Sequence, residues 1–149
     1  MLKGINLMGQ SRSILVADDE EGDIMLLQLA LRKAGVKSDL LVARDGREAV
    51  DYLAGSQLPG RNHVPARPGL FLLDLKMPCM SGFDVLEWLA SRPEFKDLPV
   101  VVLSSSSNEE DIQKARQMGA REYLVKPSGL QALTRLVQDV HARYLAAAA

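Results

Sequence analysis

Short, almost wholly apolar runs alternate along the chain with longer segments whose apolar residues recur every three or four positions. The runs have the length of a strand, and their unbroken apolarity is typical of parallel strands that are covered on both faces. Five such strands are predicted: Ser13–Ala17, Leu40–Ala43, Leu70–Leu73, Val100–Leu103 and Tyr123–Val125.

The segments between the runs carry helix signals. Asp45 with Glu48, and Ser128 with Gln131, have the spacing of a capping box, in which a side chain at each end satisfies a free backbone N–H. Glycines that follow the periodic segments are typical helix terminators. Five helices are predicted: Ile24 to Ala34, Asp45 to Ala54, Phe83 to Ala90, Asn108 to Gly119, and Ser128 to about Leu145.

The alternation of strand and helix predicts an α/β fold, because only a parallel sheet needs a helix in each connection. Right-handed crossovers then favour a doubly wound, five-stranded parallel sheet flanked by five helices. We expect one domain over residues 13–145, an N-terminal tail over 1–12, and a C-terminal tail or cloning remnant over 146–149. Gln57 to Gly69 reads as a long, proline-rich loop.

Composition narrows the function. A formal net charge of −1 gives no basic excess for nucleic acid. No apolar run approaches the roughly 20 residues that span a bilayer, so no membrane role is expected. Met1 to Arg12 lacks the apolar core of a secretory signal. The single cysteine, Cys79, leaves no internal disulfide and fits a reducing compartment, so we expect a cytoplasmic protein.

Chemistry-bearing residues follow four of the predicted strands. In an open parallel α/β sheet, ligands bind beyond the carboxyl ends of the strands. Asp18 and Asp19 follow the first strand, Asp74 the third, Ser104 the fourth and Lys126 the fifth. The fold therefore gathers three carboxylates, a hydroxyl and an ammonium at one edge.

Those charges suit phosphoryl transfer. Crowded carboxylates repel one another, and a hard divalent cation such as Mg²⁺ relieves the repulsion while it keeps a place for phosphate oxygens. Phosphoryl transfer needs mostly positioning and charge neutralisation. An attacking carboxylate that forms an aspartyl-phosphate is a known covalent strategy.

Four segments carry a resemblance to a known family. They read ILVADDE, LLDLKMPCMSG, PVVVLSSSS and EYLVKP. Over about Ser13 to Leu145 the chain resembles the receiver domain of two-component response regulators, which implies a flavodoxin-like receiver fold. The resemblance implies a signalling domain rather than an enzyme, with only self-catalysed phosphotransfer and dephosphorylation.

The resemblance also implies roles for individual residues. Asp74 corresponds to the phosphoacceptor, which is phosphorylated by a histidine kinase in a magnesium-dependent reaction. Asp19 corresponds to a direct Mg²⁺ ligand, and Asp18 to one that acts through water. The backbone carbonyl of Lys76 and the carboxylate of Asp74 complete the implied metal ligands.

Two further positions correspond to a switch. Ser104 matches the hydroxyl residue that senses the phosphoryl group, and Tyr123 matches an aromatic residue that fills the space vacated beside it. Lys126 matches the family's lysine, and its bond to Pro127 would be cis. Threonine is commoner at position 104, but serine keeps the hydroxyl.

More narrowly, the chain resembles the single-domain regulators that pair with phytochrome-type histidine kinases. RPGLFLLDLKMP and FKDLPVVVLSSSSNEEDIQKA carry this likeness. That subgroup often has asparagine where this chain has Lys76, so we expect an altered phosphate lifetime. The resemblance implies a homodimer through the fourth helix, fifth strand and fifth helix, and a downstream protein or phosphotransfer partner. The implied dimer face comprises Ile112 to Met118, Arg121 to Tyr123 and parts of Leu130 to Tyr144.

Three alternatives stay open. An aspartate-nucleophile phosphatase would need a second aspartate two residues after the nucleophile, where Lys76 stands. A flavin-binding module needs a phosphate-binding loop after the first strand, where the chain has acidic residues. A degenerate receiver that serves only for docking is disfavoured, since every chemical position is filled.

Overall fold

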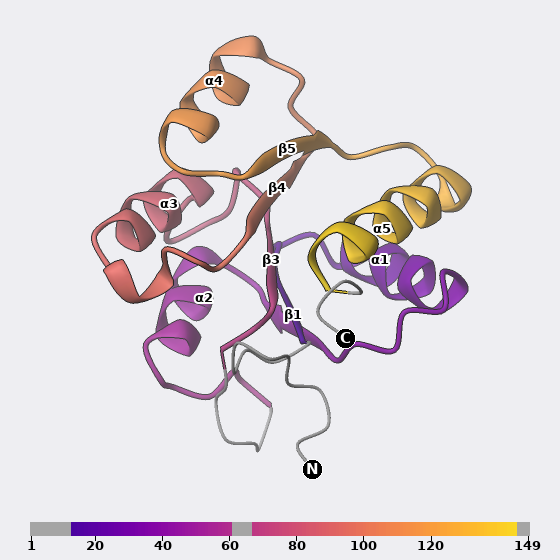
Figure 1. Ribbon diagram of the computed structural model, residues 1–149, viewed down its shortest axis with the longest axis horizontal. Helices are drawn as coiled ribbons and strands as arrows, with labels where there is room; N and C mark the ends of the chain where they lie inside the picture. Colours follow the sequence, from indigo (N-terminus) through magenta and orange to yellow (C-terminus); the bar gives the residue numbers. More distant parts are fainter. Residues whose placement is uncertain (1–12, 61–66, 146–149) are drawn as a thin grey trace.

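A single parallel sheet with helices on both faces forms the domain (Figure 1). The computed structural model describes residues 13–60 and 67–145, so the predicted tails 1–12 and 146–149 lie outside the described residues. The strands are β1 (Ile14–Ala17), β2 (Leu40–Ala43), β3 (Leu70–Leu73), β4 (Val100–Ser104) and β5 (Glu122–Val125). The helices are α1 (Glu21–Lys33), α2 (Gly46–Leu53), α3 (Gly82–Ala90), α4 (Glu109–Gln117) and α5 (Leu130–Tyr144), with a 3₁₀ turn η1 (Pro93–Phe95).

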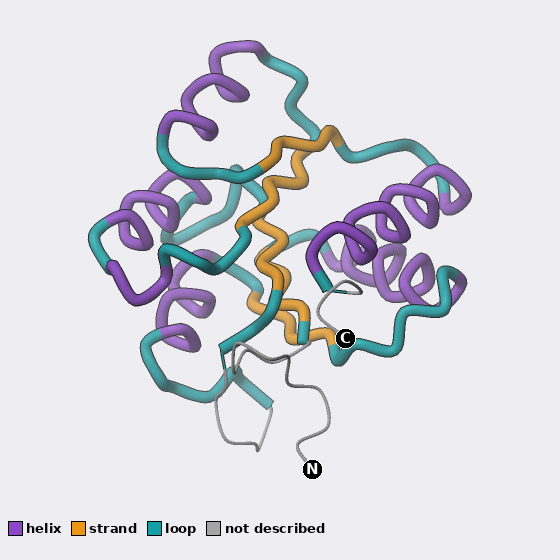
Figure 2. Tube along the Cα trace, in the orientation of Figure 1, coloured by secondary structure: helices purple, strands orange, loops and turns teal. Residues whose placement is uncertain are grey.

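The strand order is β2-β1-β3-β4-β5, and all the pairings are parallel. Figure 2 shows the sheet edge-on, with α1 and α5 on one side and α2, α3 and α4 on the other. The doubly wound fold class is therefore confirmed. Because the chain reverses its direction of winding at β1, the ends of β1 and β3 border the crevice in which such sheets bind ligands.

The core has two halves, one on each face of the sheet. Leu70 and Leu72 of β3 pack toward α1 and α5, while Phe71 and Leu73 pack toward α2 and α3. Successive side chains of a strand point to opposite faces, so a strand that is covered on both faces must be apolar throughout. That requirement explains the unbroken apolar runs.

Most predicted boundaries agree with the structure within one residue, but α1 is an exception. It begins at Glu21, three residues before the first apolar position, Ile24. Its first turn carries Glu21 and Asp23, whose negative charges are favourable at the positive end of the helix dipole. Hydrophobic periodicity could not reveal a polar first turn.

Two local predictions were wrong. The Ser128–Gln131 capping box is absent: α5 begins after Gly129, which has a positive φ of 93° and forms no side-chain cap. The Lys126–Pro127 bond is not cis, since no cis peptide bond occurs among the described residues. The trans form is the one that an X–Pro amide favours, by about 0.5–1 kcal/mol.

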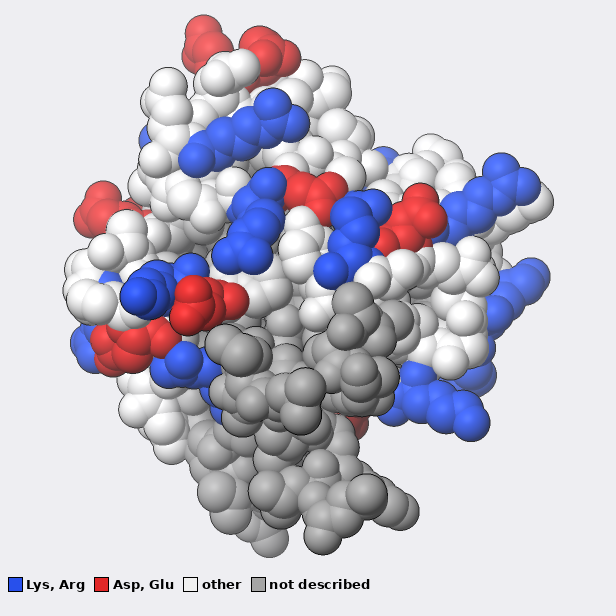
Figure 3. Space-filling view, viewed as in Figure 1, with Lys and Arg blue, Asp and Glu red and all other residues white. Residues whose placement is uncertain are grey.

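The face in Figure 3 mixes acidic and basic side chains. Blue and red side chains lie next to one another over much of that face, and blue ones alone stand at its lower right edge. Over the described residues, no helix is both long and apolar enough to cross a membrane.

Candidate functional site

The carboxyl ends of the strands fix the backbone of the site. Sheet hydrogen bonds continue one residue past the strands: the N–H of Asp74 donates to the carbonyl of Ala17 (3.0 Å), and that of Lys126 to the carbonyl of Ser104 (2.7 Å). The first residue after each of these strands is therefore held by the sheet as well. This brings the predicted site residues from β1, β3, β4 and β5 to one edge.

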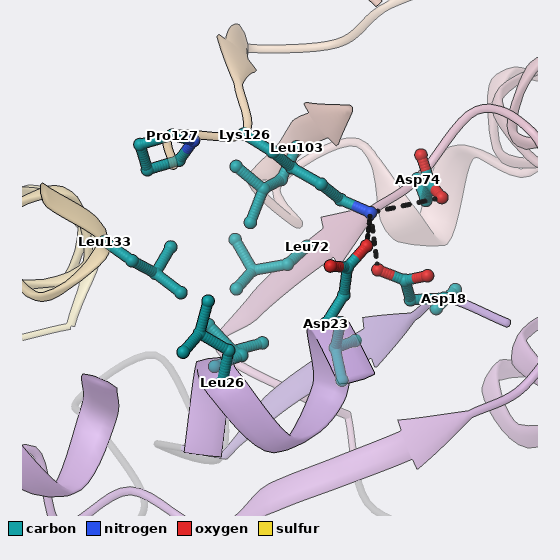
Figure 4. Close-up of a pocket in the computed structure, with 12 residues that line it drawn as sticks. Asp18, Asp23, Leu26, Leu72, Asp74, Leu103, Lys126, Pro127 and Leu133 are labelled. Carbon is teal, nitrogen blue, oxygen red and sulfur yellow. Dashed lines mark hydrogen bonds and ion pairs between the residues drawn. The ribbon is translucent and has the colours of Figure 1, made fainter. Parts of the chain in front are cut away.

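The ammonium group of Lys126 lies at the centre of the site (Figure 4). It donates to Asp18 Oδ2 at 2.8 Å, to Asp23 Oδ2 at 2.8 Å and to Asp74 Oδ2 at 3.4 Å. An ammonium has three N–H donors, so each carboxylate takes one. Burial alone would lower the pKa of Lys126, but its hydrogen bonds to Asp18 and Asp23 and the charge of Asp74 outweigh burial and raise it.

The stem of Lys126 runs through an apolar gap between α1, α5 and the sheet. Leu26, Leu72, Leu103 and Leu133 line this gap (Figure 4). A lysine buries its methylenes along apolar surface and delivers its charge where polar groups are available. The gap therefore directs the ammonium to the three carboxylates.

Asp74 is buried, with an exposure of 7%. Its Oδ1 accepts from the N–H of Leu75 at 2.8 Å, which leaves Oδ2 on the side of Lys126. Burial raises the pKa of the Asp74 carboxyl, and the charge of Asp18 adds to this, while Lys126 and the Leu75 N–H oppose it. One ammonium does not neutralise three carboxylates, so the site keeps an excess of negative charge.

Asp18, Asp19 and Asp74 form a group that fits a divalent cation. Each offers a carboxylate oxygen, and these oxygens lie within 4.8 Å of one another. An all-oxygen set of this kind suits Mg²⁺, Mn²⁺ or Ca²⁺ and not a soft metal. Both oxygens of Asp18 already accept hydrogen bonds, Oδ1 from the N–H of Glu20 and Oδ2 from Lys126.

A cleft of about 330 Å³ opens over the group. Its walls include Asp19, Lys76 and the start of the β4–α4 loop, and it reaches Asp74 and Lys126. All the predicted site residues except Asp18 and Tyr123 line this cleft. Through this cleft a small ligand could reach Asp74.

Ser104 and Tyr123 meet through a residue that the sequence did not suggest, Ser106. The N–H of Ser106 donates to Ser104 Oγ (3.2 Å), and the Tyr123 hydroxyl donates to the Ser106 carbonyl (2.8 Å). The Ser106 hydroxyl in turn donates to Asp111 in the first turn of α4 (2.8 Å). Ser104 is 2% and Tyr123 7% exposed, so the ring already lies inward in this structure.

The loop after Asp74 folds back on it at Gly82. The N–H of Gly82 donates to the Leu75 carbonyl at 2.9 Å. A Cβ at this position would lie 2.3 Å from the backbone oxygen of Asp74, so only glycine fits. Ser81 then opens α3 with a capping box to Asp84.

Asp23 and Ser106 are the two functional candidates that sequence reasoning missed. Asp23 lies in the first turn of α1, four residues after Asp19, where an acidic side chain is ordinarily a response to the helix dipole. Ser106 lies in a run of four serines, and a hydroxyl that closes a turn on the backbone two residues away is the signal that could have found it.

Comparisons with known proteins agree with this geometry. The family model described as "Response regulator receiver domain" matches residues 14–138. The response regulator Rcp1 of Synechocystis sp. is 34% identical over 132 residues, which cover 89% of this chain and 88% of Rcp1.

Two solved structures are similar over most of their length. The phosphorylated cyanobacterial phytochrome response regulator RcpA gives a TM-score of 0.80 at 36% identity, covering 93% of this chain and 96% of RcpA. The Mn²⁺-bound form of Rcp1 gives 0.74 at 34% identity, covering 88% and 92%.

Proposed function

The chain belongs to the response regulator receiver family of two-component signalling, and we propose that it accepts a phosphoryl group from a histidine kinase on Asp74. One observation carries the proposal: the buried carboxylate of Asp74 lies 3.4 Å from the ammonium of Lys126, and its oxygens converge with those of Asp18 and Asp19. The phosphorylated state of its relative RcpA supports the same chemistry.

In the proposed reaction, an oxygen of Asp74 attacks the phosphorus of a phosphohistidine. A new O–P bond forms while the P–N bond to the kinase histidine breaks, and the histidine nitrogen leaves with the electron pair. We assign the attack to Oδ2, the oxygen on the side of Lys126, while Oδ1 accepts from the N–H of Leu75. Lys126 and the hydroxyl of Ser104 then neutralise and bind the phosphoryl oxygens.

Magnesium is the proposed metal. Asp19 and Asp74 would hold it directly, Asp18 through water and Lys76 through its backbone carbonyl. Bound there, Mg²⁺ would neutralise charge on the transferring phosphoryl group. Lys126 lies closer to Asp18 Oδ2 (2.8 Å) than to Asp74 Oδ2 (3.4 Å), which favours an indirect role for Asp18. The Mn²⁺-bound form of Rcp1 supports a divalent ion in general.

We further propose a signalling route. The likeness to RcpA, a phytochrome response regulator, supports a phytochrome-type histidine kinase as donor. The phosphoryl group would draw the hydroxyl of Ser104 toward it, and the Ser106 bonds would carry that change to α4 and Tyr123. The face made by α4, β5 and α5 would serve a homodimer or a downstream partner. The protein would act in the cytoplasm, without turnover as an enzyme beyond its own phosphorylation and dephosphorylation.

Phosphorylation with acetyl phosphate tests the proposal. Wild-type protein should gain one base-labile phosphoryl group in Mg²⁺ and none in excess chelator, and Asp74→Asn should gain none. Asp19→Asn should weaken Mg²⁺ binding more than Asp18→Asn does. A label that persists on Asp74→Asn, or full transfer without a divalent ion, would contradict the assignment.

The dimer has its own test. Sedimentation of the wild-type protein should show a dimer whose population changes when beryllofluoride, a phosphate mimic, is added with Mg²⁺. An isologous two-fold contact is the default symmetry for such an assembly. A monomer under both conditions would remove the dimer from the proposal and leave phosphorylation untouched.

A further inference from the structure

Lys126 has a third acidic partner that lies outside the convergent group of carboxylates. Asp23 Oδ2 is 2.8 Å from Lys126 Nζ, as close as Asp18, while the phosphoacceptor Asp74 is farther away at 3.4 Å. Asp23 approaches from α1, on a different side of the ammonium from Asp74 (Figure 4). The lysine is thus held more tightly by its flanking acids than by the residue it is to serve.

Asp23 differs from Asp18 in what a metal ion could change. Asp18 belongs to the convergent oxygens of the divalent-cation group, and Asp23 does not. A bound cation would therefore compete with Lys126 for Asp18 and Asp74, but it would leave the Asp23 pair in place. With a cation bound there, Asp23 would be the acid outside the metal group that still draws the ammonium away from Asp74.

We propose that Asp23 is a positioning residue that competes with the phosphoryl group for Lys126 and so limits how tightly the phosphorylated state is held. The inference rests on the proposed function, since it concerns the same lysine and the same phosphoryl group. Lys126 has three N–H donors, and all of them point to carboxylates in this structure. The donor that points to Asp74 would pass to a phosphoryl oxygen there, while the attraction of Asp23 for the ammonium would remain.

The exposure of the Asp23 side chain sets how much its loss should change the affinity for a phosphate mimic. The side chain of Asp23 is 42% exposed, against 7% for Asp18. An ion pair that water reaches is weak, so the loss of Asp23 should change phosphate-mimic affinity by only about two- to fivefold. Asp18 and the apolar gap around the stem keep Lys126 in the site after that loss.

Beryllofluoride binding in Mg²⁺ measures the competition. Asp23→Asn removes the charge but keeps the shape, and it should bind beryllofluoride about threefold more tightly than wild type, because Lys126 is freed for the mimic. Asp23→Glu keeps the charge and should restore affinity to near the wild-type value. Phosphate lifetime after acetyl phosphate labelling should lengthen in Asp23→Asn and return in Asp23→Glu.

Glu21→Gln is the matched control. Glu21 lies in the same first turn of α1, and its loss changes the net charge by the same amount, but it pairs with Arg44 and not with Lys126. The affinity of the Glu21→Gln variant for beryllofluoride should stay at the wild-type value. Urea unfolding of each variant separates a change in folding from a change in the site.

The outcomes separate this inference from the proposed function. If wild-type protein fails to bind beryllofluoride, the proposed function fails. If wild type binds but Asp23→Asn binds equally or more weakly, or if Glu21→Gln tightens binding as much as Asp23→Asn, the competition at Lys126 is wrong and the proposed function stands.

Discussion

Helices α1 and α4 differ sharply in how they are held. α1 buries Ile24, Leu27, Ala30 and Leu31 and packs against α5 along the same face of the sheet. Within α4, only Ala115 is buried. Hydrophobic stabilisation scales with the apolar area removed from water, so core contacts hold α1 more firmly than α4, where the partly buried Ile112 packs beside Ala115.

Polar and cation–π contacts also hold α4 against the rest of the domain. The Ser106 hydroxyl donates to Asp111 at one end of the helix, and the Lys114 ammonium lies 4.3 Å from the ring centroid of Phe83 on α3. Such contacts are weak, and they can be exchanged for others at little cost. The acids and the lysine of the site are therefore held by well-packed elements, while α4, the helix that would carry the signal, is held mainly by weak contacts.

The largest expected effect is a difference in stability loss when one apolar side chain is truncated in α1 and one in α4. Leu27→Ala should lower the free energy of unfolding by about 3 kcal/mol, because Leu27 is 3% exposed and its removal leaves a cavity between α1, α5 and the sheet. Ile112→Ala should cost about 1 kcal/mol, because this α4 side chain is only half-buried. Equal losses in urea unfolding would refute the contrast.

The second expected effect is a gain in the free energy of unfolding, and it arises at the cluster of acids in the site. Asp74→Asn should raise the free energy of unfolding by about 1 kcal/mol at neutral pH without metal, because it removes one of several crowded carboxylates. Adding Mg²⁺ should stabilise the wild type more than the variant, since a ligand stabilises the state that binds it.

The stability difference between the wild type and Asp74→Asn should depend on pH. The pKa of Asp74 is raised in the folded protein, so the folded state keeps its proton to a higher pH than the unfolded chain does. As pH rises from the ordinary pKa of 3.8 through the raised one, the wild type loses stability relative to Asp74→Asn. The difference between the two proteins should therefore vanish in acid. If urea unfolding shows a difference that grows as pH falls, a raised pKa of Asp74 is not its cause.

The sequence was enough to predict the fold and to name candidate site residues, because both follow from strong local signals. Leu70–Leu73 was placed to the residue, since a strand covered on both faces must be apolar throughout. Asp74, Ser104 and Lys126 could be placed at one edge because parallel strands share one carboxyl edge, and the family resemblance then suggested roles for them.

Side-chain partners across the fold could not be predicted in the same way. Asp23 and Lys126 are separated by 103 residues, and only the tertiary packing of α1 near the end of β5 brings their charges together. The Ser128–Gln131 capping box matched in spacing, yet the chain turns through Gly129 instead, because a glycine there reaches a positive φ at no steric cost. Local spacing says which partners are possible, and tertiary packing selects among them.

The third prediction tests the loose attachment of α4. Ser106→Ala removes the hydroxyl that bonds Asp111 but keeps the backbone groups that meet Ser104 and Tyr123. It should cost about 0.5–1 kcal/mol of stability and speed amide hydrogen exchange in α4, with α1 unchanged. Ser107→Ala, at an exposed neighbour, is the control. Faster exchange in α1 as well would mean that the two helices are not independent.

The smallest effect is expected at Cys79, in the loop that joins Asp74 to α3. Cys79 has a φ of 67°, a left-handed conformation that costs a residue with a Cβ about 1 kcal/mol. Cys79→Gly relieves this strain, but glycine adds roughly 0.4–1 kcal/mol of unfolded-state entropy, so the net gain should be about 0.5 kcal/mol or less. Cys79→Ala keeps the strain and should stay near wild type. The side chain is exposed, so neither variant opens a cavity. If Cys79→Ala gains as much stability as Cys79→Gly in urea unfolding, the backbone strain is not the cause.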